Sequence, residues 1–145
     1  DIRALTAWYE QELRDLGVDV RTGLEMTPES IKEFGADAVI CCTGADAVMP
    51  GSIPGIDSEK AVSCTDVIDG IRKVGHKVAI VGAGLVGAEM AYDMAKEEKR
   101  EVVLIDGLND ILSNDPEGVP FQTRWMLNEL LELNGVKKYM SHRLK

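Results

Sequence analysis

The sequence lacks any run of about 18 apolar residues, the length that a helix needs to cross a bilayer. It also lacks a leader in which a basic stretch precedes an apolar one, the pattern that directs a chain to secretion. Both absences predict a cytoplasmic protein with no membrane partner.

Basic residues are outnumbered, with 16 Lys and Arg against 25 Asp and Glu and a net charge of −9. An acidic surface repels phosphate backbones, so we expect no nucleic acid partner. The same charge does not exclude an anionic cofactor, because local backbone N–H groups hold a cofactor phosphate regardless of the overall field.

Cysteine is also scarce, and the three residues are Cys41, Cys42 and Cys64. An odd count with an adjacent pair makes a poor disulfide framework and a poor metal cage, so packed, reduced thiols are expected. The two histidines, His76 and His142, have no partner at catalytic or metal-binding spacing. We predict a surface or strand-edge position for both and no metal site.

What the chain does have is 45% apolar residues, enough for the core of one domain. Apolar spacing and turn residues predict helices over residues 3–16, 28–35, 65–72, 84–99 and 120–134. Apolar runs predict strands over residues 18–20, 38–42, 62–64, 77–81, 101–106 and 136–140. This alternation predicts an α/β fold, a Rossmann-like parallel sheet with helices on both faces.

The helical spacing also predicts which side chains face inward. Trp8 and Trp125 lie on apolar helix faces, so a core position is favoured over a stacking platform for a ligand. In the last predicted helix we expect four apolar side chains to face inward, namely Met126, Leu127, Leu130 and Leu131.

A segment rich in glycine and proline, residues 44–57, predicts an internal boundary. The chain begins at Asp1 and ends at Lys145, shortly after the last predicted strand. We therefore expect a piece of a longer protein. A truncated sheet exposes edges and apolar surface, so self-association is a further expectation.

The clearest motif is Gly82-Ala83-Gly84-Leu85-Val86-Gly87, which fits G-x-G-x-x-G between a predicted strand and a predicted helix. Gly82 permits the tight turn, Gly84 lets a pyrophosphate approach the backbone, and Gly87 lets the helix lie close to the sheet. The pyrophosphate would sit at the helix start, on the backbone of Leu85 and Val86. The alternative is a tight turn that binds no ligand.

Asp106 ends the next strand, about 20 residues after the glycine motif. A carboxylate at this place accepts a hydrogen bond from the ribose 2′-OH of NAD and repels the extra phosphate of NADP. The residues that follow, Gly107 to Asp110, include no arginine to receive that phosphate. The sequence therefore predicts NADH over NADPH, and a plain strand-end cap is the alternative for Asp106.

A second motif lies upstream. Residues 38–45, with Pro50 and Ile53-Pro54-Gly55, resemble the "ATG" segment of flavoproteins with two dinucleotide-binding domains, the pyridine nucleotide-disulfide oxidoreductase type. In that family the segment closes the FAD domain before the chain crosses into the NAD(P)H domain. The resemblance implies that residues 1–58 are a partial FAD-domain segment with the crossover linker. Residues 59–145 are then an NAD(H)-binding domain truncated at its C-terminus.

The resemblance also implies roles for single residues. Thr43 and Gly44 would lie against FAD, and Glu89 matches a family glutamate near the nicotinamide amide. An ordinary polar helix residue is the alternative for Glu89. Two positions depart from the family pattern, since Cys42 replaces an alanine and Ala47 stands where proline is common.

The opening residues look most similar to the C-terminal half of Old Yellow Enzyme-like reductases, which include 2-enoate reductase, 2,4-dienoyl-CoA reductase and related NADH:flavin oxidoreductases. The similar segments are Trp8-Tyr9, residues 17–20 and residues 36–39. This resemblance implies a parent protein with FMN in a barrel, FAD, and an iron–sulfur cluster. The FMN and cluster sites would lie outside this chain.

The sequence thus predicts an NADH-binding part of a flavin-dependent oxidoreductase, which positions the nicotinamide for hydride transfer to FAD in the parent. The dinucleotides and the remaining parent domains are its expected partners. The chain holds no predicted catalytic residue, so little turnover is expected from it alone. A non-catalytic regulatory module is the main alternative, and a site for S-adenosylmethionine is a remote one.

Overall fold

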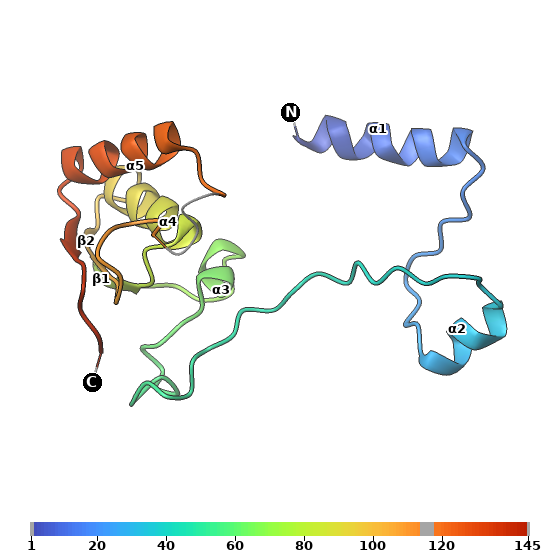
Figure 1. Ribbon diagram of the computed structural model, residues 1–145, viewed down its shortest axis with the longest axis horizontal. Helices are drawn as coiled ribbons and strands as arrows, with labels where there is room; N and C mark the ends of the chain where they lie inside the picture. The colour runs from blue at the N-terminus through green and yellow to red at the C-terminus, as the bar shows by residue number, and fades with distance from the viewer. Residues whose placement is uncertain (1, 114–117, 145) are drawn as a thin grey trace. The chain divides into compact units, whose positions relative to one another are not determined.

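The computed structural model describes residues 2–113 and 118–144. Its contacts divide the chain into two units, Asp1–Gly44 and Ala45–Lys145. Figure 1 shows the elements of each unit along the chain. The division falls where the turn-rich segment begins, which is the region in which the sequence predicted an internal boundary.

The first unit contains two helices, α1 (Ile2–Asp15) and α2 (Pro28–Phe34). Helix α2 begins with a capping box, in which the Thr27 side chain accepts a hydrogen bond from the Ser30 backbone and the Ser30 side chain accepts one from Thr27. It ends at Gly35, whose φ of 71° is the left-handed conformation of a helix C-cap. Both helix predictions for this unit are confirmed.

The strand predictions for the first unit are wrong. Residues 18–20 and 38–42 are not strands, and Ile40 is 86% exposed. A strand satisfies its backbone N–H and C=O groups only through a neighbouring strand. The described part of this unit provides no such neighbour.

The core prediction for Trp8 is wrong for a related reason. Its side chain is 53% exposed, and no described residue of the first unit is buried. The apolar stripe of α1 exists as predicted, but nothing in the described part of this unit packs over it.

The second unit is built on a three-stranded parallel sheet in the order β1-β2-β3, with strands Lys77–Val81, Glu101–Ile105 and Lys137–Tyr139. Helix α4 (Leu85–Lys96) joins β1 to β2, and α5 (Phe121–Leu133) joins β2 to β3 (Figure 1). The predicted βαβ units, and with them the α/β Rossmann-like class, are confirmed.

A short helix, α3 (Cys64–Ile68), precedes β1. The Ser63 side chain accepts a hydrogen bond from the Asp66 backbone at 3.0 Å and so caps this helix. The strand predicted over residues 62–64 is therefore wrong, because Ser63 is the N-cap of a helix that begins at Cys64.

The helices and the sheet share one core cluster, which includes Ile80, Ala91, Leu104, Leu127 and Leu131. Both crossovers run in the same direction across the sheet, so their common right-handedness brings α4 and α5 to the same face. In the described residues, helices cover only that face, whereas the sequence predicted helices on both.

The other face of the sheet is open, and Val81 is 51% exposed on it. On α5 the inward positions of Leu127 and Leu131 are confirmed and Leu130 is half-buried. Met126 and Trp125 are exposed, so the inward predictions for these two are wrong. Helix α5 packs on one side only, so its buried stripe is narrower than its apolar one. No described helix combines the length and apolar character needed to cross a membrane.

Candidate dinucleotide site

The glycine turn joins the end of β1 to the start of α4. Gly82 has a φ of 103°, a conformation that side-chain-bearing residues rarely adopt, and its N–H donates to the Ile105 carbonyl at 2.8 Å. Gly84 then serves as the N-cap of α4 with extended backbone. The first glycine is thus required by the turn itself.

Gly87 lies where the helix comes closest to the turn. A Cβ atom at this position would lie 1.9 Å from the Gly82 carbonyl oxygen and 3.5 Å from Cγ2 of Ile80. Only a glycine fits here without moving backbone. The predicted role of the third glycine, close packing of helix on strand, agrees with this geometry.

The start of α4 offers free backbone donors. Gly84 has no side chain to cap the helix, and the first bond of the helical ladder runs from the Ala88 N–H to the Gly84 carbonyl. The N–H groups of Leu85, Val86 and Gly87 precede that bond and point out of the helix end. Unpaired donors at the positive end of a helix dipole are the groups that hold a pyrophosphate.

Asp106 ties the end of β2 to the glycine turn. Its Oδ2 accepts a hydrogen bond from the Ala83 N–H at 2.6 Å, and its Oδ1 accepts one from the Leu108 N–H at 2.8 Å. The capping role that the sequence left open is therefore present. An ionised carboxylate has about four acceptor positions, so both oxygens keep capacity for ribose hydroxyl groups.

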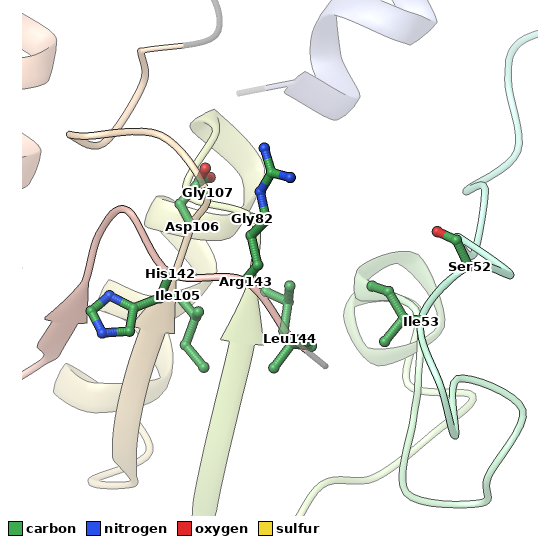
Figure 2. A pocket seen from close by; sticks show the side chains of 10 residues that line it. Ser52, Ile53, Gly82, Ile105, Asp106, Gly107, His142, Arg143 and Leu144 are labelled. Atoms are coloured by element: carbon green, nitrogen blue, oxygen red, sulfur yellow. The ribbon is translucent and has the colours of Figure 1, made fainter.

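A pocket of about 400 Å³ opens at the carboxyl ends of β1 and β2 (Figure 2). In open parallel sheets, ligands bind at this edge. The residues that line the pocket are Ser52, Ile53, Val81, Gly82, Ile105, Asp106, Gly107, His142, Arg143 and Leu144.

The structure therefore brings Gly82 and Asp106 together at one pocket, with Gly84 and Gly87 in the same turn and helix start. Glu89 is exposed on α4 and is not among the lining residues. Thr43 and Gly44 are exposed in the first unit, so their contacts with FAD stay a prediction.

Sequence reasoning missed the contribution of the segment after β3. The Ser141 N–H donates to the Leu108 carbonyl at 2.7 Å, and the His142 N–H donates to the Asp106 carbonyl at 2.9 Å. These bonds hold His142 and Arg143 against the pocket. The signal was present, because the residues after a third parallel strand lie at the same edge as Asp106.

The cysteines are not packed as the sequence predicted. Cys41 and Cys42 are exposed, and only Cys64 is half-buried. Burial raises the pKa of the Cys64 thiol above its ordinary value. In the part of the chain that the structure describes, no group of three His, Cys, Asp or Glu side chains is arranged to hold a metal ion.

Comparison with known proteins identifies the family of the chain. Residues 24–145 match the model of the pyridine nucleotide-disulphide oxidoreductase family. The chain belongs to this family. Its members bind FAD and NAD(P)H, and the chain carries the pyridine nucleotide-binding part of such flavin oxidoreductases. The family resemblance drawn from the glycine motif and the Thr43–Gly55 segment is confirmed.

Two relatives within this comparison are similar to the chain in sequence. The chain is 42% identical over 112 residues to a cinnamate reductase of Clostridium sporogenes, covering 77% of this chain and 16% of that protein. It is 36% identical over 110 residues to an NADH oxidase of Thermoanaerobacter brockii, covering 72% of this chain and again 16% of the relative. The chain thus spans about a sixth of each relative.

A solved structure agrees in fold. A 2-naphthoyl-CoA reductase in complex with 2-naphthoyl-CoA superimposes with a TM-score of 0.76 at 24% identity. The match covers 92% of this chain and 19% of that one.

Proposed function

We propose that the second unit binds NADH and positions its nicotinamide for hydride transfer to FAD held by a longer parent flavoprotein. The parent would be an NADH oxidase or an enoate or dienoyl-CoA reductase. The observation that carries this is the Asp106 carboxylate, fixed by the Ala83 N–H at the glycine turn and facing a pocket at the strand ends.

The residues fit a dinucleotide in three places. The free N–H groups at the start of α4 would hold the pyrophosphate, and the Asp106 oxygens would accept the hydroxyl groups of the adenosine ribose. Glu89, exposed on α4, is the candidate neighbour of the nicotinamide amide. NADH, when bound, supplies the hydride, while the chain supplies position and electrostatics.

The first unit has a matching role in this proposal. Residues 1–58 would be part of an FAD domain and the crossover from it, with Thr43 and Gly44 against the flavin nucleotide. The exposed apolar segments of this unit support the proposal, since residues 18–20 and 38–42 would find partner strands in the parent. The family match begins at residue 24 and includes the Thr43–Gly55 segment, which favours a flavoprotein over a regulatory module.

The test is a fluorescence titration of the 145-residue chain with NADH and with NADPH. We expect tighter binding of NADH, because Asp106 accepts the 2′-OH and repels a 2′-phosphate. Asp106→Asn should weaken NADH binding about tenfold, since it replaces a charge-assisted hydrogen bond with a neutral one.

A matched control is Asp110→Asn. This carboxylate accepts a hydrogen bond from its neighbour Ile111 and does not line the pocket, so its loss removes the same charge at a nearby place. NADH affinity should stay within about twofold of wild type in this control. The proposal fails if neither nucleotide binds, or if the two Asn variants behave alike.

A further inference from the structure

The pocket is lined by the cationic side chain of Arg143, although the residues directly after Asp106, Gly107 to Asp110, include no arginine. Arg143 follows β3, yet it lines the same pocket as Asp106 and Gly107. Its Cγ and Nε atoms both lie 3.9 Å from the place where a Cβ of Gly107 would be. The Arg143 side chain therefore lies beside Gly107, the residue directly after Asp106.

Backbone hydrogen bonds fix this arrangement. The Asp106 N–H donates to the Tyr139 carbonyl at 3.1 Å, and the Asp106 carbonyl accepts from the His142 N–H at 2.9 Å. The residue before Arg143 is thus bonded to the residue before Gly107. Figure 2 shows the Arg143 side chain extending from this segment toward the side of the pocket where the Asp106 carboxylate lies.

The guanidinium is available to a ligand. Arg143 is exposed, and among the described residues its side chain has no hydrogen-bond or ion-pair partner. A guanidinium presents a planar fork of donors that matches a phosphate group. If the ribose binds at Asp106 as proposed, the group that distinguishes NADPH from NADH is a phosphate on the 2′-oxygen of that ribose, and this is the group that a guanidinium in the same pocket would bind.

We infer that Arg143 is a specificity-determining residue of this site, which binds the 2′-phosphate and offsets the repulsion from Asp106. The inference rests on the proposed function. It adds that NADPH is a second, weaker ligand of the site, and that the discrimination between the two nucleotides depends on Arg143 as well as on Asp106.

The experiment compares wild type with Arg143→Ala and Arg143→Lys, in the 145-residue chain, with two pairs of probes. NADH and NADPH form one pair, and 5′-AMP and 2′,5′-ADP (adenosine 2′,5′-bisphosphate) form the other, so each pair differs only in the 2′-phosphate. Lys96→Ala is the matched control, because it removes a cation at the far end of α4.

Arg143→Ala should weaken the binding of NADPH and 2′,5′-ADP about tenfold and change that of NADH and 5′-AMP less than about twofold. Arg143→Lys keeps the charge without the fork and should fall between wild type and the alanine variant. Lys96→Ala should leave all four affinities and both ratios unchanged.

Three outcomes overturn the inference. The first is that Arg143→Ala weakens the binding of all four probes equally, and the second is that it changes the binding of none of them. The third is that the wild-type chain binds NADH but shows no measurable binding of NADPH. Each of these leaves the proposed function standing. A wild-type chain that binds neither dinucleotide overturns the proposed function and the inference together.

Discussion

The two units of this chain differ in what holds their elements together. Among the described residues, the first unit has two well-formed helices and no buried side chain, whereas the second has a sheet, three helices and a common core. Helices close their hydrogen bonds locally, and a capping box such as that of Thr27 completes them without help from elsewhere. The difference shows which parts of a fold are local and which depend on distant partners.

One apolar segment from each unit shows this difference in burial and strand pairing. Residues 38–42 and residues 101–105 are both short, and all of them are apolar except Glu101, but Ile40 is 86% exposed and Leu104 is fully buried. Strand β2 lies between β1 and β3, with Leu104 paired to Ile80 on one side and Lys138 on the other. Residues 38–42 have no such neighbouring strands among the described residues of their own unit.

Hydrogen exchange measures this contrast directly and should give the largest effect. Amides of residues 101–105 should exchange on the order of a hundredfold more slowly, after correction for intrinsic rates, than those of residues 38–42. The comparison needs only one sample of the 145-residue chain and peptide-level mass spectrometry. Equal protection of the two segments would mean that residues 38–42 have found a partner strand, for example in a second copy.

Gly87→Ala should break the second unit and leave the first untouched. The added Cβ would meet the Gly82 carbonyl oxygen at 1.9 Å, so we expect a loss of about 2–3 kcal/mol of unfolding free energy. Urea unfolding followed by Trp125 fluorescence, in a Trp8→Phe background, reports on the second unit alone.

Gly75→Ala is the control for this substitution. Nothing lies within 4 Å of a Cβ at Gly75, and its backbone is not left-handed. Stability should therefore change by less than about 1 kcal/mol. A result in which Gly87→Ala and Gly75→Ala unfold at the same urea concentration would refute the close contact.

The smallest expected effect concerns the cysteines. Burial raises the pKa of Cys64, so a smaller fraction of it is thiolate at pH near 8 than for an exposed cysteine of ordinary pKa. Iodoacetamide should alkylate Cys64 several-fold more slowly than the exposed Cys41 and Cys42. Peptide mass spectrometry gives the rates.

The sign of this effect fixes its pH dependence. Because the pKa of Cys64 is raised, its alkylation should accelerate over a higher pH range than that of an unperturbed thiol. Concentrated urea should abolish the difference in rate between Cys64 and the other two cysteines. Equal rates in the native chain would argue that α3 does not pack against α4.

The sequence predicted local structure well wherever local rules decide it. The caps at Thr27 and Gly35, the strands at 77–81 and 101–105, and the glycine turn each follow from a few adjacent residues. The burial of individual side chains was predicted less well. Trp8 and Met126 lie on apolar stripes, but a stripe reveals only that a helix has a face to bury, not whether the chain provides something to bury it against.

The residues of the candidate site also fall into two groups, those that local sequence predicts and one that only the tertiary structure reveals. Gly82 and Gly87 could be assigned because the motif is contiguous, and Asp106 because its spacing from the motif is regular. Arg143 reaches the pocket only through the pairing of β3 with β2 and the hydrogen bonds after it. Such a residue is found by asking which segments end at the same sheet edge.

The contact between Gly87 and the Gly82 carbonyl also bears on how such motifs should be interpreted in evolution. The third glycine is demanded by the packing of the protein on itself, with no ligand involved. A descendant that stopped binding nucleotides would still lose stability if it replaced this glycine. A change at this glycine would therefore report on the stability of the second unit, whereas the proposed nucleotide site is better tested at Asp106, which lines the pocket.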